Sequence, residues 1–159
     1  MAMKTIPQSL NLRSLIEENF EQALLTDDYH ARDALMNFVI VGSGPTRVKL
    51  AGALAEIKKG ILPKEYPDLD TRRATINLIP SGDRILDAMS EVASRKAENF
   101  LEKLSVQVWK NVQVTSYDGK TVTTNSDLSF TSVTVVWAAG VMGVTIKGLD
   151  AKDLLAGGN

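Results

Sequence analysis

Two glycines in the first third of the chain are the residues that best indicate a ligand-binding site. Gly42 and Gly44 stand in the string GSGP, directly after a short apolar run and directly before a stretch with helical spacing. Glycine allows a tight turn and lets a ligand approach the main chain closely, because no side chain is in the way. The N-terminus of a helix adds free N–H groups and the positive end of the helix dipole. The pattern therefore predicts a turn that can bind phosphate groups.

The elements around these glycines follow from the same stretch. Residues 38–41 are large and mostly β-branched, which is typical of a strand buried on both faces. Beyond the turn, helical spacing over residues 46–59 is carried by Val48, Leu50, Ala51, Leu54 and Ala55. Strand, glycine turn and helix form the opening unit of a dinucleotide-binding fold. One position departs from the G-x-G-x-x-G pattern, because Arg47 stands where a glycine or alanine lets the helix pack close to the strand.

Composition limits the classes of function. A chain of 159 residues with 44% hydrophobic content is about the size of one domain. The net charge of -1 gives no electrostatic case for binding nucleic acid or an anionic membrane. The chain has no cysteine and one histidine, His30, which excludes disulfide scaffolds, thiolate metal sites and a polyhistidine metal centre. No apolar run approaches the roughly 20 residues that span a bilayer, so we expect a soluble cytoplasmic domain without a metal site.

The rest of the chain predicts a mainly parallel sheet with helices and a meander. Residues 1–9 are expected to be a poorly ordered leader, and Asn11 is a plausible N-cap for a helix whose apolar stripe runs from Leu12 to Leu24. Residues 60–70, with two prolines, predict an irregular connection. The other predicted elements are a helix over 29–36, strands over 74–79, 106–109 and 133–137, and a helix over 90–104 that Ser90 caps.

The stretch from residue 112 to residue 130 changes to a period of 2, and Asp118 and Gly119 lie between two β-rich runs. This is a hairpin signal, so an antiparallel meander is expected in place of a crossover helix. We therefore predict an α/β fold: a Rossmann-like three-layer domain with a parallel sheet and a β-meander crossover, preceded by an N-terminal helix. The expected segments are an N-terminal leader and helical segment over 1–36, the dinucleotide-binding domain over 37–150, and a tail over 151–159.

These motifs resemble a known family. The string FVIVGSGPTRVKLAGALAE, DRIL at 83–86, FLEKL at 100–104 and VVWAAGV at 135–141 are similar to the NADH-binding domain of type II NADH dehydrogenases. These flavoproteins pass electrons from NADH through FAD to quinone, and the resemblance covers roughly residues 10–150. It implies an excised domain whose partner is the FAD domain of the parent enzyme. FAD would belong only to that full-length parent, which is expected to be peripheral on the cytoplasmic face of the membrane. The fragment needs no catalytic residue of its own and should not turn over alone.

The resemblance also assigns cofactor-binding residues. They are Gly42, Ser43, Gly44, Pro45 and Thr46 in the phosphate-binding turn, Pro80 and Ser81 after the second strand, and Ala139 and Gly140 in the turn that faces the nicotinamide half.

The departures from the family pattern gather at this site. After the threonine the family has glycine, an aliphatic residue and glutamate, whereas this chain has Arg47, Val48 and Lys49. Arg47 is expected to bend outward or to push the helix from the sheet, and such overpacking costs about 1 to 3 kcal/mol. Pro80 stands where the family has the acid that holds the adenosine ribose, and it offers only a backbone carbonyl. The sequence therefore predicts weak or lost NADH binding.

Several explanations of this cluster stay open. The chain is an engineered variant, a natural paralogue that has lost tight NADH binding, or one that binds a different phosphorylated ligand. Loss of the ribose acid with Ser81 and Arg84 nearby would also suit a 2′-phosphate. The rival function is a non-catalytic scaffold or interaction domain that uses Arg47 and Lys49 to contact a protein or an anion. A homo-oligomer is a further option, because the N-terminal stripe favours self-association if excision removes its packing partner.

Overall fold

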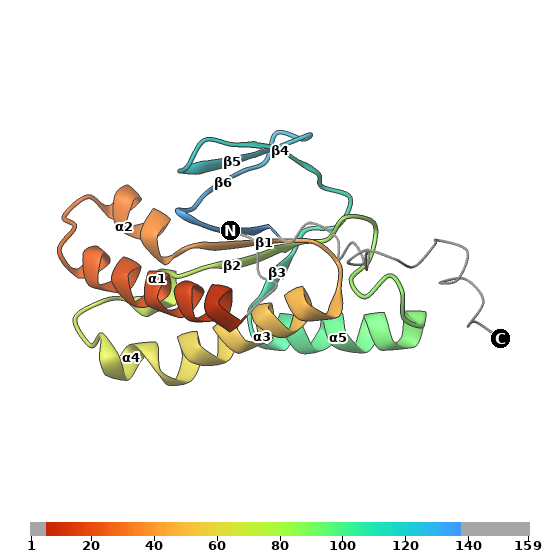
Figure 1. Cartoon of the computed structure of the whole chain (residues 1–159), viewed down its shortest axis with the longest axis horizontal. Helices are drawn as coiled ribbons and strands as arrows, with labels where there is room; N and C mark the ends of the chain where they lie inside the picture. Colours follow the sequence, from red (N-terminus) through yellow and green to blue (C-terminus); the bar gives the residue numbers. More distant parts are fainter. Residues whose placement is uncertain (1–5, 138–159) are drawn as a thin grey trace, which may run out of the picture.

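A computed structural model describes the backbone of residues 6–137 and the side chains of residues 11–137. A parallel sheet of four strands in the order β3-β2-β1-β7 forms its centre (Figure 1). The strands are β1 (Phe38–Val41), β2 (Ile76–Ile79), β3 (Gln107–Val108) and β7 (Thr134–Trp137). The last residue of β1, Val41, is in register with Ile79 of β2 and Trp137 of β7. The carboxyl ends of these three strands therefore meet at one edge of the sheet.

Two further layers enclose the sheet, as the sequence predicts (Figure 1). The helices are α1 (Ile6–Leu24), α2 (Tyr29–Met36), α3 (Pro45–Gly60), α4 (Leu62–Glu65) and α5 (Glu91–Lys103), with a short 3-10 helix over Thr71–Arg73. Helices α1, α3 and α5 lie on one side of the sheet. On the other side lies an antiparallel meander of β4 (Val114–Tyr117), β5 (Thr121–Thr124) and β6 (Ser129–Thr131). The predicted Rossmann-like fold with a meander crossover is confirmed.

Strand β1 is buried on both faces because its side chains alternate between two cores. Phe38 and Ile40 belong to the core under the helices, together with Phe20 of α1. Val39 points the other way and packs in the core under the meander, beside Val122 of β5. This double burial explains why the sequence of β1 is a continuous apolar run rather than an alternating one.

Helix α1 finds its packing partners within the chain. Leu12 and Phe20 are buried, and the Phe20 ring stacks on Phe38 and on Tyr66, with centroid distances of 6.3 Å and 5.4 Å. Asn19 of α1 also donates a buried hydrogen bond of 2.7 Å to the Thr134 hydroxyl of β7. The apolar stripe is thus largely covered by the chain itself, and self-association cannot be attributed to a stripe left bare.

Two predictions about local structure are wrong. Helix α1 begins at Ile6 rather than after Asn11, which lies inside it, so part of the expected leader is helical. Pro7 is tolerated in the first turn of α1, because the N–H groups of a first helical turn have no partner within the helix. The connection over residues 60–70 is also not wholly irregular, because it contains α4. That helix buries Leu62, with only 5% of its surface exposed, and gives the segment an anchor in the core.

No helix between residues 6 and 137 is both long enough and apolar enough to cross a membrane.

Candidate functional site

The candidate site lies at the carboxyl edge of the sheet, where the turn after β1 meets the turn after β2. The N–H of Gly42 donates to the carbonyl oxygen of Ile79 at 2.8 Å, which holds the start of the glycine turn against the end of β2. Gly42 has a φ of +125°, a backbone conformation that residues with a Cβ atom rarely adopt. Glycine at this position is therefore required by the backbone whether or not a ligand binds.

Two serines join the turns. The hydroxyl oxygens of Ser43 and Ser81 are 3.1 Å apart and share a hydrogen bond. The carbonyl oxygen of Ser43 accepts from the N–H of Leu86 at 2.7 Å, so the loop that contains DRIL is tied to the glycine turn as well. Leu86 has a φ of 52° and is buried, which marks a constrained loop. The fold thus brings the predicted residues of the two turns together.

The first turn of α3 has the features of an anion-binding helix end. Gly44 is its N-cap and makes no side-chain cap, Pro45 begins the helix, and no acidic residue lies in the first turn. Such an end carries a partial positive charge that favours a phosphate, although Pro45 has no N–H group and the N–H groups of Arg47 and Val48 donate to the carbonyl oxygen of Gly44 at 3.0 Å and 3.3 Å. Thr46 lies exposed beside it.

Arg47 covers this turn from within. Its Nη1 atom lies 2.7 Å from the point where a Cβ atom on Gly44 would stand, and its Nε atom lies 2.9 Å from the corresponding point on Gly42. The Nε atom is buried. Helix α3 nevertheless packs closely on the sheet, because Ala51 and Ala55 are 0% and 2% exposed. The prediction that Arg47 bends outward or pushes the helix from the sheet is therefore wrong, because the side chain folds back over both glycines while the helix stays packed.

The second strand ends without an acid. Pro80 is buried and Ser81 is exposed, so neither supplies a carboxylate to a ribose. Arg84 donates from Nη2 to the carbonyl oxygen of Asp87 at 2.6 Å and is held within its own loop. Ala139 and Gly140, predicted to face the nicotinamide half, lie outside the described residues.

The sequence of the chain matches a known family over almost its whole length. The profile of the pyridine nucleotide-disulphide oxidoreductase family aligns with residues 5–155. The chain belongs to this family. Its relatives include the type II NADH:quinone oxidoreductase Ndh of Mycobacterium tuberculosis, which is 34% identical over 87% of this chain. Another is the mitochondrial external alternative NAD(P)H-ubiquinone oxidoreductase B1 of Arabidopsis thaliana, 30% identical over the same share. The chain covers 31% and 25% of these two proteins, so it spans less than a third of their length.

Solved structures show the same fold. NDH2 from Plasmodium falciparum, determined in complex with NADH, superposes with a TM-score of 0.78 and 20% identity, over 86% of this chain and 29% of that one. A reduced CoADR-RHD from Bacillus anthracis superposes more loosely, with a TM-score of 0.60 and 11% identity, over 88% of this chain and 20% of that one. These likenesses concern the fold of this family member and not its ligand.

In this family member the backbone of the site suits a dinucleotide, but two side chains do not. The second glycine of the fingerprint is side-chain-free so that the backbone can approach a pyrophosphate. Arg47 occupies that space above Gly44. Pro80 follows the second strand, at the position where the family resemblance predicts an acid, and offers no carboxylate. The residues present therefore fit a bound dinucleotide only if Arg47 leaves its position.

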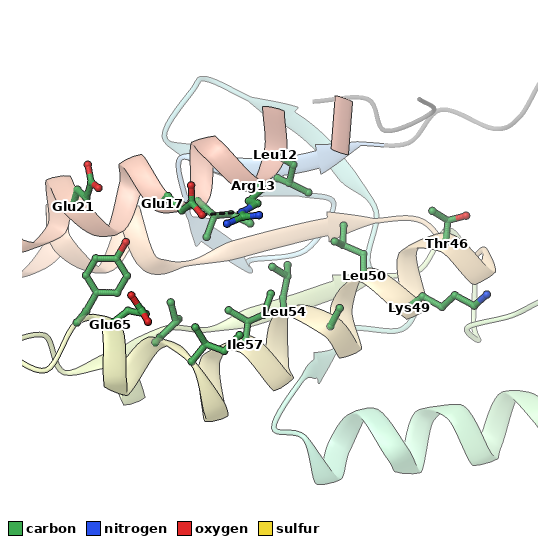
Figure 2. A pocket seen from close by; sticks show the side chains of 15 residues that line it. Leu12, Arg13, Glu17, Glu21, Thr46, Lys49, Leu50, Leu54, Ile57 and Glu65 are labelled. Atoms are coloured by element: carbon green, nitrogen blue, oxygen red, sulfur yellow. Dashed lines mark hydrogen bonds and ion pairs between the residues drawn. The ribbon is translucent and has the colours of Figure 1, made fainter. Parts of the chain in front are cut away.

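A groove beside the turn is a feature that the sequence does not reveal. It has a volume of about 1040 Å³ and lies between α1 on one side and α3 with α4 on the other (Figure 2). Thr46 and Lys49 line one end of it, so the groove begins next to the glycine turn. Its lining comes from α1 and from the later helices α3 and α4, which are separate in the sequence, so helical periodicity alone cannot locate it.

Proposed function

We propose that this chain is an NAD(H)-binding domain derived from an NADH:quinone oxidoreductase-like flavoprotein, with NADH affinity impaired by Arg47 and Pro80. Family membership and the kinds of reaction named for its relatives support the assignment to NADH. The observation that carries the impairment is the 2.7 Å separation between Arg47 Nη1 and the Cβ position of Gly44. A pyrophosphate that approaches the backbone of Gly44 must first displace this guanidinium.

Two effects of opposite sign act on NADH. The positive charge of Arg47 attracts a phosphate, but an ion pair near the surface contributes only about 0 to 1 kcal/mol. Against this stand the packing that Arg47 loses when it moves and the hydrogen bonds that a ribose acid would make. A hydrogen bond to a charged group contributes about 1.5 to 3 kcal/mol, and Pro80 cannot supply one. The losses exceed the gain, so the net result is weaker binding.

This function includes no turnover by the chain alone. The aligned part of this chain covers 31% and 30% of two relatives named type II NADH:quinone oxidoreductases, so we infer that the flavin site belongs to regions outside it. The partner we infer is the FAD domain of the parent enzyme, which would supply the hydride acceptor while this domain positions the nicotinamide. On this proposal the domain is cytoplasmic, and the parent enzyme to which it belongs is peripheral on the cytoplasmic face of the membrane.

A second function is a non-catalytic scaffold or interaction domain that contacts a protein or an anion. The exposed position of Lys49 at the groove favours this alternative. Arg47, in contrast, is turned inward over the glycines, so a contact of this kind would depend mainly on Lys49.

Calorimetric titration of the chain with NADH, NADPH and AMP tests the proposal. We expect NADH to bind with a Kd well above about 1 μM, if heat is detected at all. AMP should bind no better, because its phosphate meets the same Arg47 at the glycine turn and its ribose meets the same Pro80. A sub-micromolar Kd for NADH would refute the impaired site, and tight binding of NADPH alone would replace it with a 2′-phosphate site.

A further inference from the structure

A small pocket at the C-terminal end of α3 is lined by basic side chains. It has a volume of about 330 Å³, and Lys58 and Lys59 of the last turn of α3 line it. Lys103 in the last turn of α5 and Arg72 in the 3-10 helix line it as well. The pocket thus gathers four cations in a chain whose net charge is only -1.

The packing of α5 on α3 brings these cations together. The two helices run in the same direction within the layer of helices (Figure 1). Near the end of α5, the Cδ2 atom of Leu101 lies 3.8 Å from the point where a Cβ atom on Gly52 would stand. The lack of a side chain at Gly52 therefore lets the last turn of α5 approach α3, and Lys103 reaches the same pocket as Lys58.

Only one of the four cations has a carboxylate partner within the described part of the chain. Arg72 binds both oxygens of Asp70, from Nε at 2.7 Å and from Nη2 at 3.1 Å. The lysines make no ion pair with any described residue: Lys58, Lys59 and Lys103. Burial lowers the pKa of the Lys58 ammonium group, and no described carboxylate offsets this effect. The pocket therefore holds positive charge that the protein itself does not neutralise.

The end of α5 does not need Lys103 to satisfy its carbonyl oxygens. A lysine in the last turn of a helix often serves this purpose, because those oxygens have no partner within the helix. Here the carbonyl oxygen of Leu101 accepts from the N–H of Val106 at 3.0 Å, and that of Glu102 accepts from the N–H of Ser105 at 2.9 Å. The main chain thus caps the helix, and the Lys103 ammonium group remains available to a ligand.

Two hydroxyl groups add further donors to the pocket. Thr71 lines it and is only 4% exposed, and Ser105 lines it from an exposed position. No hydrogen bond within the described part of the chain involves either hydroxyl. A hydroxyl group can donate to an oxygen atom of an anion that the lysines attract.

We propose that this pocket is an anion site separate from the glycine turn, and that it binds the phosphate group of a small molecule or of a lipid headgroup. A phosphate carries close to two negative charges near neutral pH and has three acceptor oxygens, so it can accept from several ammonium groups at once. A volume of about 330 Å³ is at the small end of the range for ligand sites, which suits one or two phosphate groups.

The pocket is remote from the candidate dinucleotide site. At a rise of about 1.5 Å per residue, Lys58 lies about 20 Å along α3 from Gly44. The inference therefore does not rest on the proposed function, and either can fail without the other.

Titration of the isotope-labelled chain with sodium pyrophosphate, followed by the amide shifts in NMR spectra, tests the proposal. Pyrophosphate is the probe because it carries two linked phosphate groups and no base or sugar. At an ionic strength of about 20 mM, where screening is weak, we expect a Kd below about 1 mM. The shifts should gather at residues 58–60, 71–73 and 103–105.

Variants of the lysines separate charge from structure. Lys58→Met and Lys103→Met keep the apolar stem and remove the charge, so each should raise the Kd at least about threefold, and the double variant at least about tenfold. Lys58→Arg keeps the charge and should stay within about twofold of the wild type. Lys96→Met, at an exposed position of α5 outside the pocket, is the matched control and should also stay within about twofold. Far-ultraviolet circular dichroism establishes that each variant is folded.

Cosedimentation with phosphatidylglycerol vesicles, with phosphatidylcholine vesicles as the control, distinguishes the two sources of phosphate. Binding to the anionic vesicles that Lys58→Met abolishes would identify a lipid headgroup, whereas pyrophosphate binding by a chain that stays off the vesicles would identify a free compound. Two results together would overturn the proposal: no shift around the lysines at about 10 mM pyrophosphate, including the case of shifts confined to residues 42–46, and no vesicle binding that depends on Lys58. A loss of affinity in Lys96→Met as large as that in Lys58→Met would overturn it as well.

Discussion

The Nη1 atom of Arg47 lies 2.7 Å from the position that a Cβ atom on Gly44 would occupy. The two residues are three apart in the sequence, at the second and third glycine positions of the fingerprint. The side chain at the third position therefore fills the space that the second keeps open. A single arginine changes both the packing of the turn and its access to a phosphate.

Replacing this arginine should restore access to the turn. Arg47→Gly is expected to tighten NADH binding at least about tenfold, since it removes the group that the pyrophosphate must displace. Calorimetric titration of the variant and the wild type measures the change. Arg95→Gly, at an exposed position of α5, is the matched control because it removes the same side chain from a helix that does not carry the glycine turn. Equal NADH affinity in wild type and Arg47→Gly would mean that Arg47 does not block the cofactor.

The two glycines of the turn should differ in their tolerance of alanine. Gly42→Ala is expected to destabilise the fold by about 1 to 3 kcal/mol, because a φ of +125° is strained for any residue with a Cβ atom. Gly44→Ala meets only the far end of the Arg47 side chain, which can move, so its cost should stay below about 1 kcal/mol. Urea denaturation measures both. In an Arg47→Gly background the cost at Gly42 should persist, and its disappearance would show that the clash with Arg47 dominates over the backbone.

A buried amide links β2 to the residue after β3. Asn77 is 4% exposed, and its Oδ1 atom accepts from the indole N–H of Trp109 at 3.0 Å. Asn77→Leu should cost about 1 to 3 kcal/mol in the free energy of unfolding, because the indole N–H loses its partner. Asn99→Leu, at an exposed position of α5, is the control and should change stability by no more than about 0.5 kcal/mol.

A double-mutant cycle separates the hydrogen bond from packing at this position. Trp109→Phe removes the donor, so Asn77→Leu should cost less in that background than in the wild type. Additive costs would indicate that the two side chains contribute independently.

Acid should weaken the first turn of the meander. The N–H groups of Thr121 and Lys120 donate to the carboxylate of Asp118 at 2.6 Å and 2.8 Å, and they lower its pKa below the ordinary value of 3.8. A lowered pKa in the folded state means that the carboxylate stabilises the fold above about pH 4 and loses this effect as the pH falls through the folded pKa.

Asp118→Asn keeps an acceptor oxygen but cannot titrate, so it tests this pH dependence. Between about pH 5 and pH 2 the variant should lose less stability than the wild type, although it is less stable near neutrality. Denaturation with urea at several pH values measures the difference. Asp127→Asn, which removes a carboxylate from the following turn, is the charge-matched control. An unchanged slope against pH in Asp118→Asn would contradict the assignment.

The local sequence pattern predicts those elements whose structure depends on neighbouring residues alone. The apolar run at residues 38–41 predicts a buried strand, and the glycines after it predict a turn. The bulk of these apolar side chains and the lack of a side chain in glycine are properties of the residues themselves. The sequence predicts Ser90 as a cap, and this is confirmed, because its hydroxyl accepts from the N–H of Ala93 at 3.3 Å. The start of α1 differs from the predicted one, because helix ends depend weakly on single residues. The sequence also does not predict α4, because Leu62 gains its burial only from the assembled core.

Residue types and their spacing are enough to predict the family, the strand-turn-helix unit, and the two positions where the site departs from the family pattern, Arg47 and Pro80. These are matters of residue type and spacing, which need no partner in space. Only the tertiary structure decided where the Arg47 side chain goes, because a long flexible side chain chooses among positions according to the packing around it. The tertiary structure also decides the hydrogen bond between the hydroxyls of Ser43 and Ser81 and the groove between α1 and α3. Each joins segments that are distant in the chain and become neighbours only when the sheet assembles.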